Sequence, residues 1–187
     1  MSIYISILYG LIQGLSEFLP VSSSGHLALL PYFMNFKDPG IFFDLMMHIG
    51  TGLAVLIYFK ADVLRIIKGS IFILVNPTKF KEADPFTLNF IFATICSVII
   101  ILAIKDLAFE FGRSSNLIAG NLIFFGIIMY FSDRRSVKKR ELSPMLTERK
   151  WLHSFIIGAS QALAVFPGVS RSGITITSAR FLGLSRK

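Results

Sequence analysis

GLIQGLSEFLPVSSSG, residues 10–25, recurs as GASQALAVFPGVSRSG, residues 158–173, at a constant offset of 148 and without a gap. Eight of the sixteen aligned positions are identical. A repeat of this density predicts two structurally related halves. The copies differ in their polar groups, because the first carries Glu17 and is followed by His26, whereas the second carries Arg171 and is followed by Thr175. We interpret the two stretches as the two walls of one site.

The composition of the chain is that of a membrane protein. Hydrophobic residues make up 53% of it, charged residues make up 16%, and the mean hydropathy is +0.67. A helix that crosses a bilayer needs about 20 apolar residues, and three stretches meet or approach that length: 41–59, 86–104 and 117–132. We therefore predict an all-α integral membrane protein, a multi-span helical bundle that forms one transmembrane domain over residues 1–187. No basic residue precedes Lys37, so the N-terminus does not resemble a signal peptide.

The basic residues are distributed unevenly between the loops. Segment 133–150 holds seven Lys or Arg against three acids, segment 60–85 holds five against three, and segment 105–116 holds two of each. Basic loops stay in the cytoplasm, so we place 60–85 and the basic loop 133–151 inside and 105–116 outside. The net charge of +8 is then a topology signal and not a nucleic-acid surface. Residues 63–75 are too short for a span, and we expect them to extend the preceding helix or to lie at the membrane interface.

The span count gives the repeat an orientation. Three spans separate the two copies, and an odd number means that the copies enter the membrane from opposite faces. Each copy is also a broken helix, interrupted by Pro20 in the first and by Pro167 and Gly168 in the second. We predict two re-entrant helical hairpins, 3–34 from the outer face and 152–185 from the inner face, in an inverted-topology repeat whose tips meet. The alternative is that Pro and Gly merely kink two ordinary spans.

The predicted boundaries of the repeats follow from these hairpins. The first repeat covers 1–132, with its hairpin and the three spans. The second begins with the hairpin at 152–187, and we expect it to be incomplete at the C-terminus, because only the hairpin of that half is present.

Clusters of hydroxyl groups precede the second helix of each hairpin. Helix starts attract anions through their free N–H groups and the helix dipole, and the guanidinium of Arg171 offers a planar fork for phosphate oxygens. For the serines the alternative is simple N-capping, and for Arg171 it is a snorkelling cation. The candidate phosphate-binding serines are Ser22, Ser23, Ser24, Ser170 and Ser172.

Glu17 is a carboxylate in an apolar stretch. An ionisable group inside the membrane is costly and usually belongs to a functional site, so we take Glu17 as a candidate site residue. It lies four residues after Gln13, so both side chains project from one helical face. His26 follows in the next helix and suits acid–base or nucleophilic chemistry near neutral pH. Asp44 and His48 form a second i, i+4 pair, for which a helix-packing hydrogen bond is the favoured interpretation.

QGLSEFLPVSSSGH (13–26) together with FPGVSRSGIT (166–175) resembles the signature pair of the bacterial undecaprenyl-diphosphate phosphatases, the bacitracin-resistance family. The first family motif, a Glu or Gln, three residues and a Glu, is matched by Gln13 and Glu17. The resemblance covers essentially the whole chain. The second motif, Pro-Gly-x-Ser-Arg-Ser-x-x-Thr, is matched by Pro167, Gly168, Ser170, Arg171, Ser172 and Thr175.

This resemblance implies hydrolysis of undecaprenyl diphosphate to undecaprenyl phosphate and inorganic phosphate at the outer face of the bacterial cytoplasmic (inner) membrane. The reaction would recycle the lipid carrier for peptidoglycan synthesis. It also implies a divalent cation, Mg²⁺ or Ca²⁺, with Glu17 and Gln13 as candidate ligands, although Gln13 replaces the Glu found in many members. The expected phosphate-binding set then gains Gly168 and Thr175, and the expected catalytic residues are Glu17, Ser23, His26 and Arg171.

The division of labour among the catalytic candidates stays open at the level of sequence. His26 would be the nucleophile, or the general base toward water or Ser23. The expected partners are the polyprenyl diphosphate and membrane lipids, with a homodimer left open and no nucleic acid. The rival hypothesis is a polyprenyl-phosphate transporter or flippase without hydrolysis, because inverted repeats with sites at the bilayer midplane are typical of secondary transporters.

Overall fold

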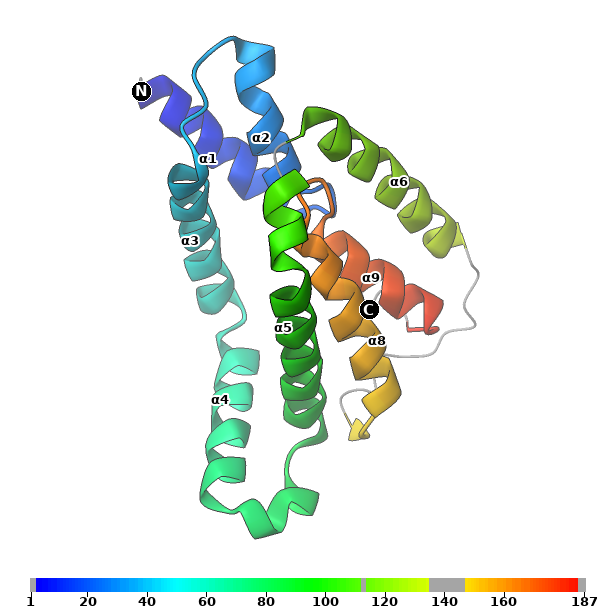
Figure 1. Cartoon of the computed structure of the whole chain (residues 1–187). Coiled ribbons are helices and arrows are strands. Elements are labelled where there is room, and N and C mark those ends of the chain that lie inside the picture. The colour runs from blue at the N-terminus through cyan, green and yellow to red at the C-terminus, as the bar shows by residue number, and fades with distance from the viewer. Residues whose placement is uncertain (1–2, 112–113, 135–146, 185–187) are drawn as a thin grey trace.

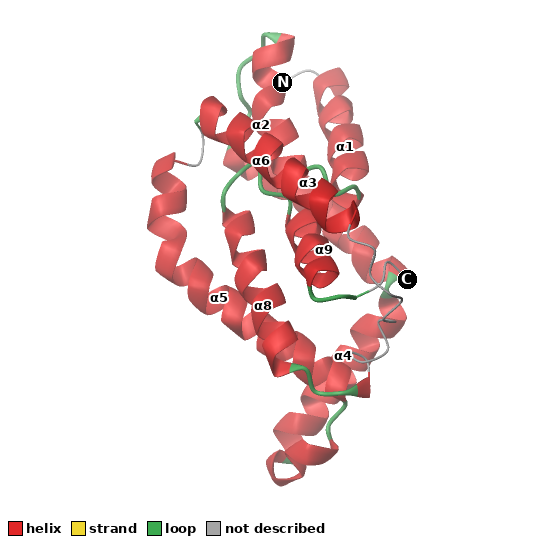
Figure 2. Ribbon diagram, turned by 90° about the vertical axis from the view of Figure 1, so that its right-hand side faces the viewer, coloured by secondary structure: helices red, strands yellow, loops and turns green. Residues whose placement is uncertain are grey.

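The computed structural model describes residues 3–111, 114–134 and 147–184, and these residues form a helical bundle without a β-strand (Figures 1 and 2). The elements are α1 (Ile3–Phe18), α2 (Ser23–Met34), α3 (Ile41–Tyr58), α4 (Lys60–Val75), η1 (Pro77–Glu82), α5 (Pro85–Phe111), α6 (Ser115–Arg134), α8 (Trp151–Ala162), η2 (Leu163–Val165) and α9 (Arg171–Phe181).

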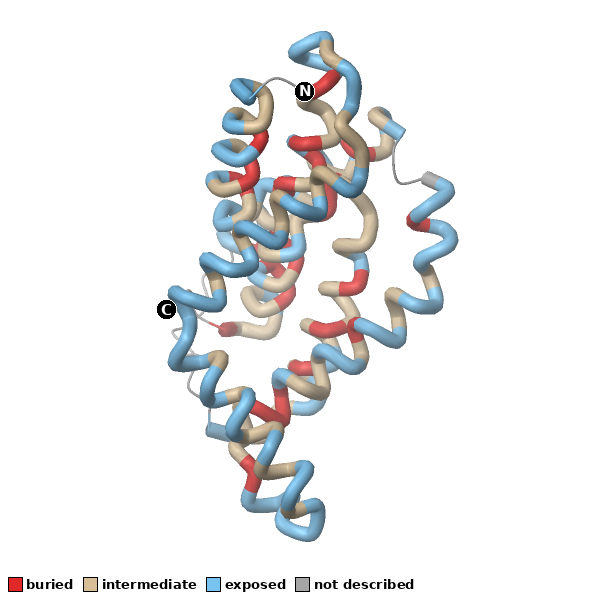
Figure 3. Tube along the Cα trace, turned by 90° about the vertical axis from the view of Figure 1, so that its left-hand side faces the viewer, coloured by how far each residue is buried: buried red, intermediate tan, exposed pale blue. Residues whose placement is uncertain are grey.

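Among the described residues, three helices are long and apolar enough to cross a membrane, and they coincide with the three predicted spans: α3, α5 and α6. Helix α3 has no buried residue, and Figure 3 shows its trace exposed or half-buried along its length. Exposed apolar side chains in such numbers suit lipid and not water. The chain is therefore an all-helical membrane protein. Helix α5 is longer than the predicted 86–104, because residues 105–111 continue the helix with polar side chains at its end.

The stretch 63–75 belongs to a separate helix, α4, which continues in the direction of α3 (Figure 1). Phe59 separates the two helices with φ −95° and ψ 27°, outside helical values. Helix α4 packs against α5, with Gly69 facing Thr87 so closely that a Cβ on Gly69 would be 2.5 Å from the Thr87 hydroxyl. The stretch is thus a helix of its own and not a continuous extension of α3, and its position at the membrane interface stays a prediction.

The N-terminus of α5 is fixed by Asp84. Its carboxylate accepts a 3.0 Å hydrogen bond from the backbone N–H of Thr87, in the manner of a helix N-cap ahead of a proline. The Arg65 side chain donates to the same carboxylate at 2.6 and 3.1 Å. Burial alone would raise the pKa of Asp84, but the hydrogen bonds from Arg65 and Thr87 outweigh it and lower that pKa below its ordinary value.

The two broken helices form hairpins at the centre of the bundle. Helix α1 packs against α2, and α8 packs against α9. The two helices of the first hairpin span residues 3–34, which are the predicted bounds, and Pro20 lies between them. The re-entrant course of this hairpin in the membrane stays a prediction. The second hairpin starts at Trp151, and its first helix ends at Ala162, before the predicted break at Pro167, since residues 163–165 tighten into η2 before the extended Phe166.

Helices α5 and α6 hold the second hairpin in place. Helix α8 lies against α5, and a Cβ on Gly158 would be 2.2 Å from the Ala93 carbonyl oxygen, so glycine permits the close approach. Gln161 donates to the Ser97 hydroxyl of α5 at 3.2 Å. Helix α6 packs against α9, and the Asn121 side chain donates to the Pro167 carbonyl at 2.9 Å. The second break is thereby fixed from two sides.

Candidate functional site

The two helix breaks touch each other reciprocally. A Cβ on Gly25 would be 3.2 Å from the Cα of Gly168, and a Cβ on Gly173 would be 3.2 Å from the carbonyl oxygen of Pro20. The offset of 148 relates Gly25 to Gly173, and it also relates Pro20 to Gly168. In each hairpin the second helix therefore begins against the break of the other hairpin. The small residues allow both helix starts to face one space.

The second helices of both hairpins begin with the same cap. The hydroxyl of Ser22 accepts from the Gly25 N–H at 3.4 Å, and the hydroxyl of Ser170 accepts from the Gly173 N–H at 3.1 Å. Ser22 lies in the left-handed region with φ 65°, a conformation that costs a non-glycine residue energy. The N-capping interpretation thus holds for these two serines. Their role in phosphate binding stays a prediction.

A polar cavity of about 350 Å³ lies at the junction of the hairpins. It draws its lining from both copies of the repeat and from α3. The lining residues are Ser16, Glu17, Ser22, Ser23, Ser24, His48, Gln161, Ala164, Val169, Ser170, Arg171, Ser172 and Thr175. The cavity therefore brings together Glu17, Arg171 and most of the predicted hydroxyl groups, although about 150 residues separate the two segments in sequence.

Glu17 is the centre of a hydrogen-bond network on one wall of this cavity. Its carboxylate accepts from the Gln13 amide at 3.0 Å and from the Ser23 hydroxyl in a short contact. The Gln13 amide also donates to the Thr51 hydroxyl of α3 at 3.3 Å. On the α3 side, His48 Nε2 is 3.7 Å from the Glu17 carboxylate. The Ser23 hydroxyl therefore donates its hydrogen bond directly to the Glu17 carboxylate.

Arg171 supplies the positive charge of the cavity from the start of α9. Its side chain is exposed, and the described residues give its guanidinium neither an ion pair nor a hydrogen bond. The Thr175 hydroxyl donates to the Arg171 or Ser172 carbonyl, both at 3.0 Å, so its hydrogen bond is made within α9. A cation without a carboxylate partner at the mouth of a polar cavity is arranged to meet an anion from outside.

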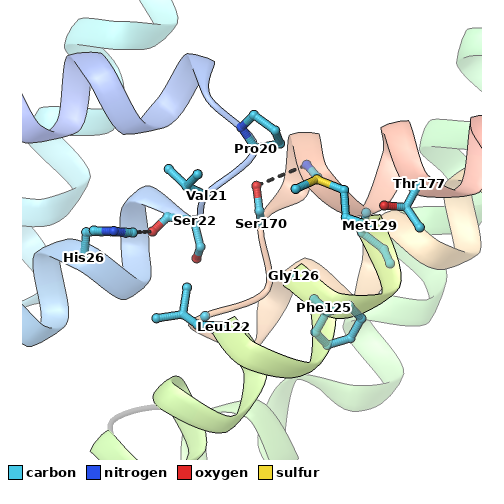
Figure 4. A pocket seen from close by; sticks show the side chains of 13 residues that line it. Pro20, Val21, Ser22, His26, Leu122, Phe125, Gly126, Met129, Ser170 and Thr177 are labelled. Carbon is cyan, nitrogen blue, oxygen red and sulfur yellow. Dashed lines mark hydrogen bonds between the residues drawn. The ribbon is translucent and has the colours of Figure 1, made fainter. Parts of the chain in front are cut away.

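The structure places His26 and Gly168 on a second cavity of about 360 Å³ instead (Figure 4). Leu122, Phe125 and Met129 of α6 supply much of its apolar lining. His26 Nδ1 donates to the Ser22 carbonyl at 2.8 Å, because a carbonyl oxygen only accepts. Gly168 has φ +90°, and a Cβ there would be 2.6 Å from the Ile118 carbonyl oxygen, so packing against α6 accounts for the glycine.

His48 lines the polar cavity, a position that the sequence did not predict. Its Nδ1 donates to the main-chain carbonyl of Asp44 at 2.7 Å, and its Nε2 faces Glu17. The i, i+4 spacing from Asp44 indicated a contact within the helix, and that contact involves the backbone. Nothing in the sequence indicates which face of the span meets the first hairpin. Gln161 had a signal, since it is the repeat counterpart of Gln13.

The groups around Glu17 fit a hard divalent cation only in part. The described residues contain no group of three or more His, Cys, Asp and Glu that could hold a metal ion. Glu17 offers carboxylate oxygens, and the carbonyl oxygen of the Gln13 side chain is buried without a hydrogen-bond partner, in a residue that is 1% exposed. Mg²⁺ is commonly bound through one or two carboxylates with substrate phosphates as the other ligands. The donor set suits that shared mode of binding.

Comparison with known proteins identifies the family. The family model described as "Bacitracin resistance protein BacA" matches residues 6–187. The chain belongs to the BacA family. Three curated relatives of this BacA chain carry the name undecaprenyl-diphosphatase. The relative from Campylobacter concisus (strain 13826) is 41% identical over 181 residues, which cover 97% of this chain and 66% of that protein.

The other two relatives give the same result. The protein of Gemmatimonas aurantiaca (strain DSM 14586 / JCM 11422 / NBRC 100505 / T-27) is 42% identical over 186 residues, covering 100% of this chain and 68% of that protein. That of Chloroherpeton thalassium (strain ATCC 35110 / GB-78) is 43% identical over 192 residues, covering 100% and 68%. The BacA chain thus spans about two thirds of the length of the curated relatives it matches.

Proposed function

We propose that this chain hydrolyses undecaprenyl diphosphate to undecaprenyl phosphate and inorganic phosphate. The observation that carries the proposal is the single polar cavity in which Glu17 and Ser23 of one hairpin meet Arg171 of the other. The names of the relatives support the same substrate and reaction. In a bacterial cell this activity would recycle the lipid carrier for cell-wall synthesis and underlie bacitracin resistance.

Charge stabilisation is the main demand of phosphoryl transfer. A diphosphate brings several negative charges into the cavity, where the free guanidinium of Arg171 would bind phosphate oxygens in a bidentate manner. The starts of α2 and α9 both face the cavity, and their N–H groups and dipoles favour the same charge. Ser24 and Ser172 would contribute hydroxyl donors to the outer oxygens, and Thr175 would join them only by giving up its bond to a carbonyl of α9.

The contact between Ser23 and Glu17 suggests the route of the proton. In the proposed reaction the Ser23 oxygen attacks the terminal phosphorus, its proton passes to Glu17, and the bond to the bridging oxygen breaks to release undecaprenyl phosphate. Glu17 passes this proton to the departing phosphate oxygen and is again a carboxylate. Water then attacks the phosphoserine and gives a proton to Glu17, and Glu17 returns that proton to the Ser23 oxygen as inorganic phosphate leaves. The place of His26 in this reaction stays a prediction, because its ring lines the second cavity.

A divalent cation, Mg²⁺ or Ca²⁺, remains part of the proposal. Glu17 and the Gln13 side-chain oxygen would hold it together with phosphate oxygens. When bound, it would neutralise negative charge on the diphosphate.

The reciprocal contacts of the two breaks support the proposed membrane architecture. Two hairpins related by an inverted repeat would enter from opposite faces and meet near the midplane. The charges of the loops favour the cytoplasmic membrane with 60–85 and 133–151 inside, and the polar cavity opening to the outer face. The polyprenyl tail would lie along the apolar helix faces within the bilayer.

Release of inorganic phosphate from undecaprenyl diphosphate by the purified protein in detergent tests the proposal. We expect release that depends on a divalent cation, is abolished by Ser23→Ala, and is retained by Ser70→Ala, whose hydroxyl donates to the Ile66 carbonyl away from the cavity. The second cavity beside the first favours the alternative, transport of a polyprenyl phosphate without hydrolysis. Movement of the lipid between leaflets of a vesicle, with no phosphate released, would establish that alternative.

A further inference from the structure

One ring nitrogen of His48 forms a hydrogen bond within α3, and the other ring nitrogen faces Glu17. Nδ1 must carry the proton, because it lies 2.7 Å from the main-chain carbonyl of Asp44, which only accepts. In the neutral ring Nε2 then presents a lone pair. That lone pair lies 3.7 Å from a carboxylate oxygen of Glu17, which also only accepts.

Two acceptors that face each other without a hydrogen between them repel. Positive charge between the nitrogen and the oxygen would turn this repulsion into attraction. A third acceptor belongs to the same network, because the Gln13 amide donates to Glu17 while its own carbonyl oxygen is buried without a partner. Arg171 lines the same cavity from α9, and among the described residues the contacts that join Glu17, Gln13 and His48 across α1 and α3 include no Lys or Arg.

We propose that His48 Nε2 is a ligand of the divalent cation, together with the Glu17 carboxylate and the Gln13 side-chain oxygen. A nitrogen ligand bonds at about 2.1 Å and an oxygen ligand at about 2.0–2.2 Å. The two bond lengths together exceed the 3.7 Å that separates the Nε2 and carboxylate oxygen atoms, so one ion contacts both. The bond from Nδ1 to a backbone carbonyl is the outer contact that metal-binding histidines nearly always make.

This assignment rests on the proposed function, because it concerns the cation of that reaction, and it narrows the chemical class of the metal. Oxygen ligands alone suit Mg²⁺ and Ca²⁺, whereas imidazole favours transition-metal ions. A set of one nitrogen and two oxygens should therefore bind Mn²⁺ more tightly than Ca²⁺. The ligands come from α1 and α3, so the cation would also join the first hairpin to the first span.

The test is to bind Mn²⁺ to the purified protein and to record its pulsed electron paramagnetic resonance, which detects a directly bound imidazole nitrogen. We expect nitrogen modulation in the unmodified protein, and we expect it to change when histidine is labelled with the heavy nitrogen isotope, a comparison that needs no variant. His48→Ala should remove the modulation and weaken Mn²⁺ binding at least about tenfold, the smaller loss seen even for outer-sphere partners. His153→Ala, on α8 and outside both cavities, is the matched control and should keep both properties.

Bound Mn²⁺ without nitrogen modulation, or modulation that persists in His48→Ala, would overturn the assignment. Failure to bind Mn²⁺ at all would overturn it as well, and would leave a proton shared by His48 and Glu17 as the source of positive charge. None of these readouts depends on hydrolysis. Phosphate release measured on the same samples therefore separates failure of this assignment from failure of the proposed function.

Discussion

Replacement of Gly158 by alanine should destabilise the bundle, because α8 and α5 approach too closely for a side chain. The added Cβ would lie 2.2 Å from the Ala93 carbonyl oxygen, whereas ordinary van der Waals contact begins at 3.4 Å. The helices must therefore separate by about 1 Å, and overpacking of a well-packed interface costs about 1–3 kcal/mol. The obstructing atom is backbone and cannot rotate away, so we expect the upper part of that range.

The internal repeat provides a matched control for this substitution. Gly10 is the counterpart of Gly158 at the offset of 148, it also lies inside a helix, and a Cβ there would have no atom of the described residues within 4 Å. Both substitutions gain the same helix propensity, up to about 1 kcal/mol in favour of alanine. The difference between the two variants therefore isolates the packing cost at Gly158.

The assay is reversible unfolding in detergent micelles, with the free energy of unfolding measured for both variants and the unmodified protein. We expect Gly158→Ala to be less stable than Gly10→Ala by about 2–3 kcal/mol. If the two variants agree within about 0.5 kcal/mol, α8 does not lie against α5 at Gly158. The placement of the second break, which depends on that contact, would then also be wrong.

The remaining predictions concern the cavity and the N-terminus of α5. Arg171→Ala should lower phosphate release at least about a hundredfold, and Arg171→Lys should restore little, since a point charge lacks the bidentate fork; near-normal turnover of the Lys variant would refute bidentate binding. Glu17→Gln and His26→Ala should each lower turnover about a hundredfold or more; activity within a few-fold of the unmodified protein would remove that residue from the mechanism. The pKa of Asp84 is lowered in the folded state, so its stabilising effect is present above the ordinary pKa of about 3.9 and is lost as the pH falls through the folded value. Asp84→Asn should therefore reduce the melting temperature at pH near 6, and thermal scans should show this reduction becoming smaller as the pH is lowered below about 3.9; a reduction that does not change with pH would show that Asp84 acts by packing alone.

The sequence predicted the helices well because their signals are local. The three spans follow from runs of apolar residues, and the breaks follow from Pro20 and Pro167, which cannot continue a helix. The meeting of the two breaks was also predictable, since the repeat placed similar polar loops in both halves. The extra length of α5 was missed because residues 105–111 are too polar for an apolar window but still favour a helix.

The position of individual side chains around the breaks was less predictable. His26 is only three residues from Ser23, yet the two side chains line different cavities. Positions three apart lie on the same broad face of a helix, so their spacing did not predict this separation. His48 joins the cavity through the packing of α3 on α1, which depends on tertiary contacts. Local spacing does not encode such contacts.

The differences between the two copies matter as much as their similarity. At the offset of 148, Ser23 corresponds to Arg171 as the first residue of its helix, and Glu17 corresponds to Val165. An identical second copy would place two carboxylates in the cavity and no cation, and such a cavity would repel a diphosphate and disfavour ionisation of either acid. Two copies of the second kind would bind phosphate but would lack both the carboxylate and the hydroxyl that it activates. The shared residues, the glycines and capping serines, build the junction. In the proposed reaction, the exchanged residues would divide phosphate binding and proton transfer between its two walls.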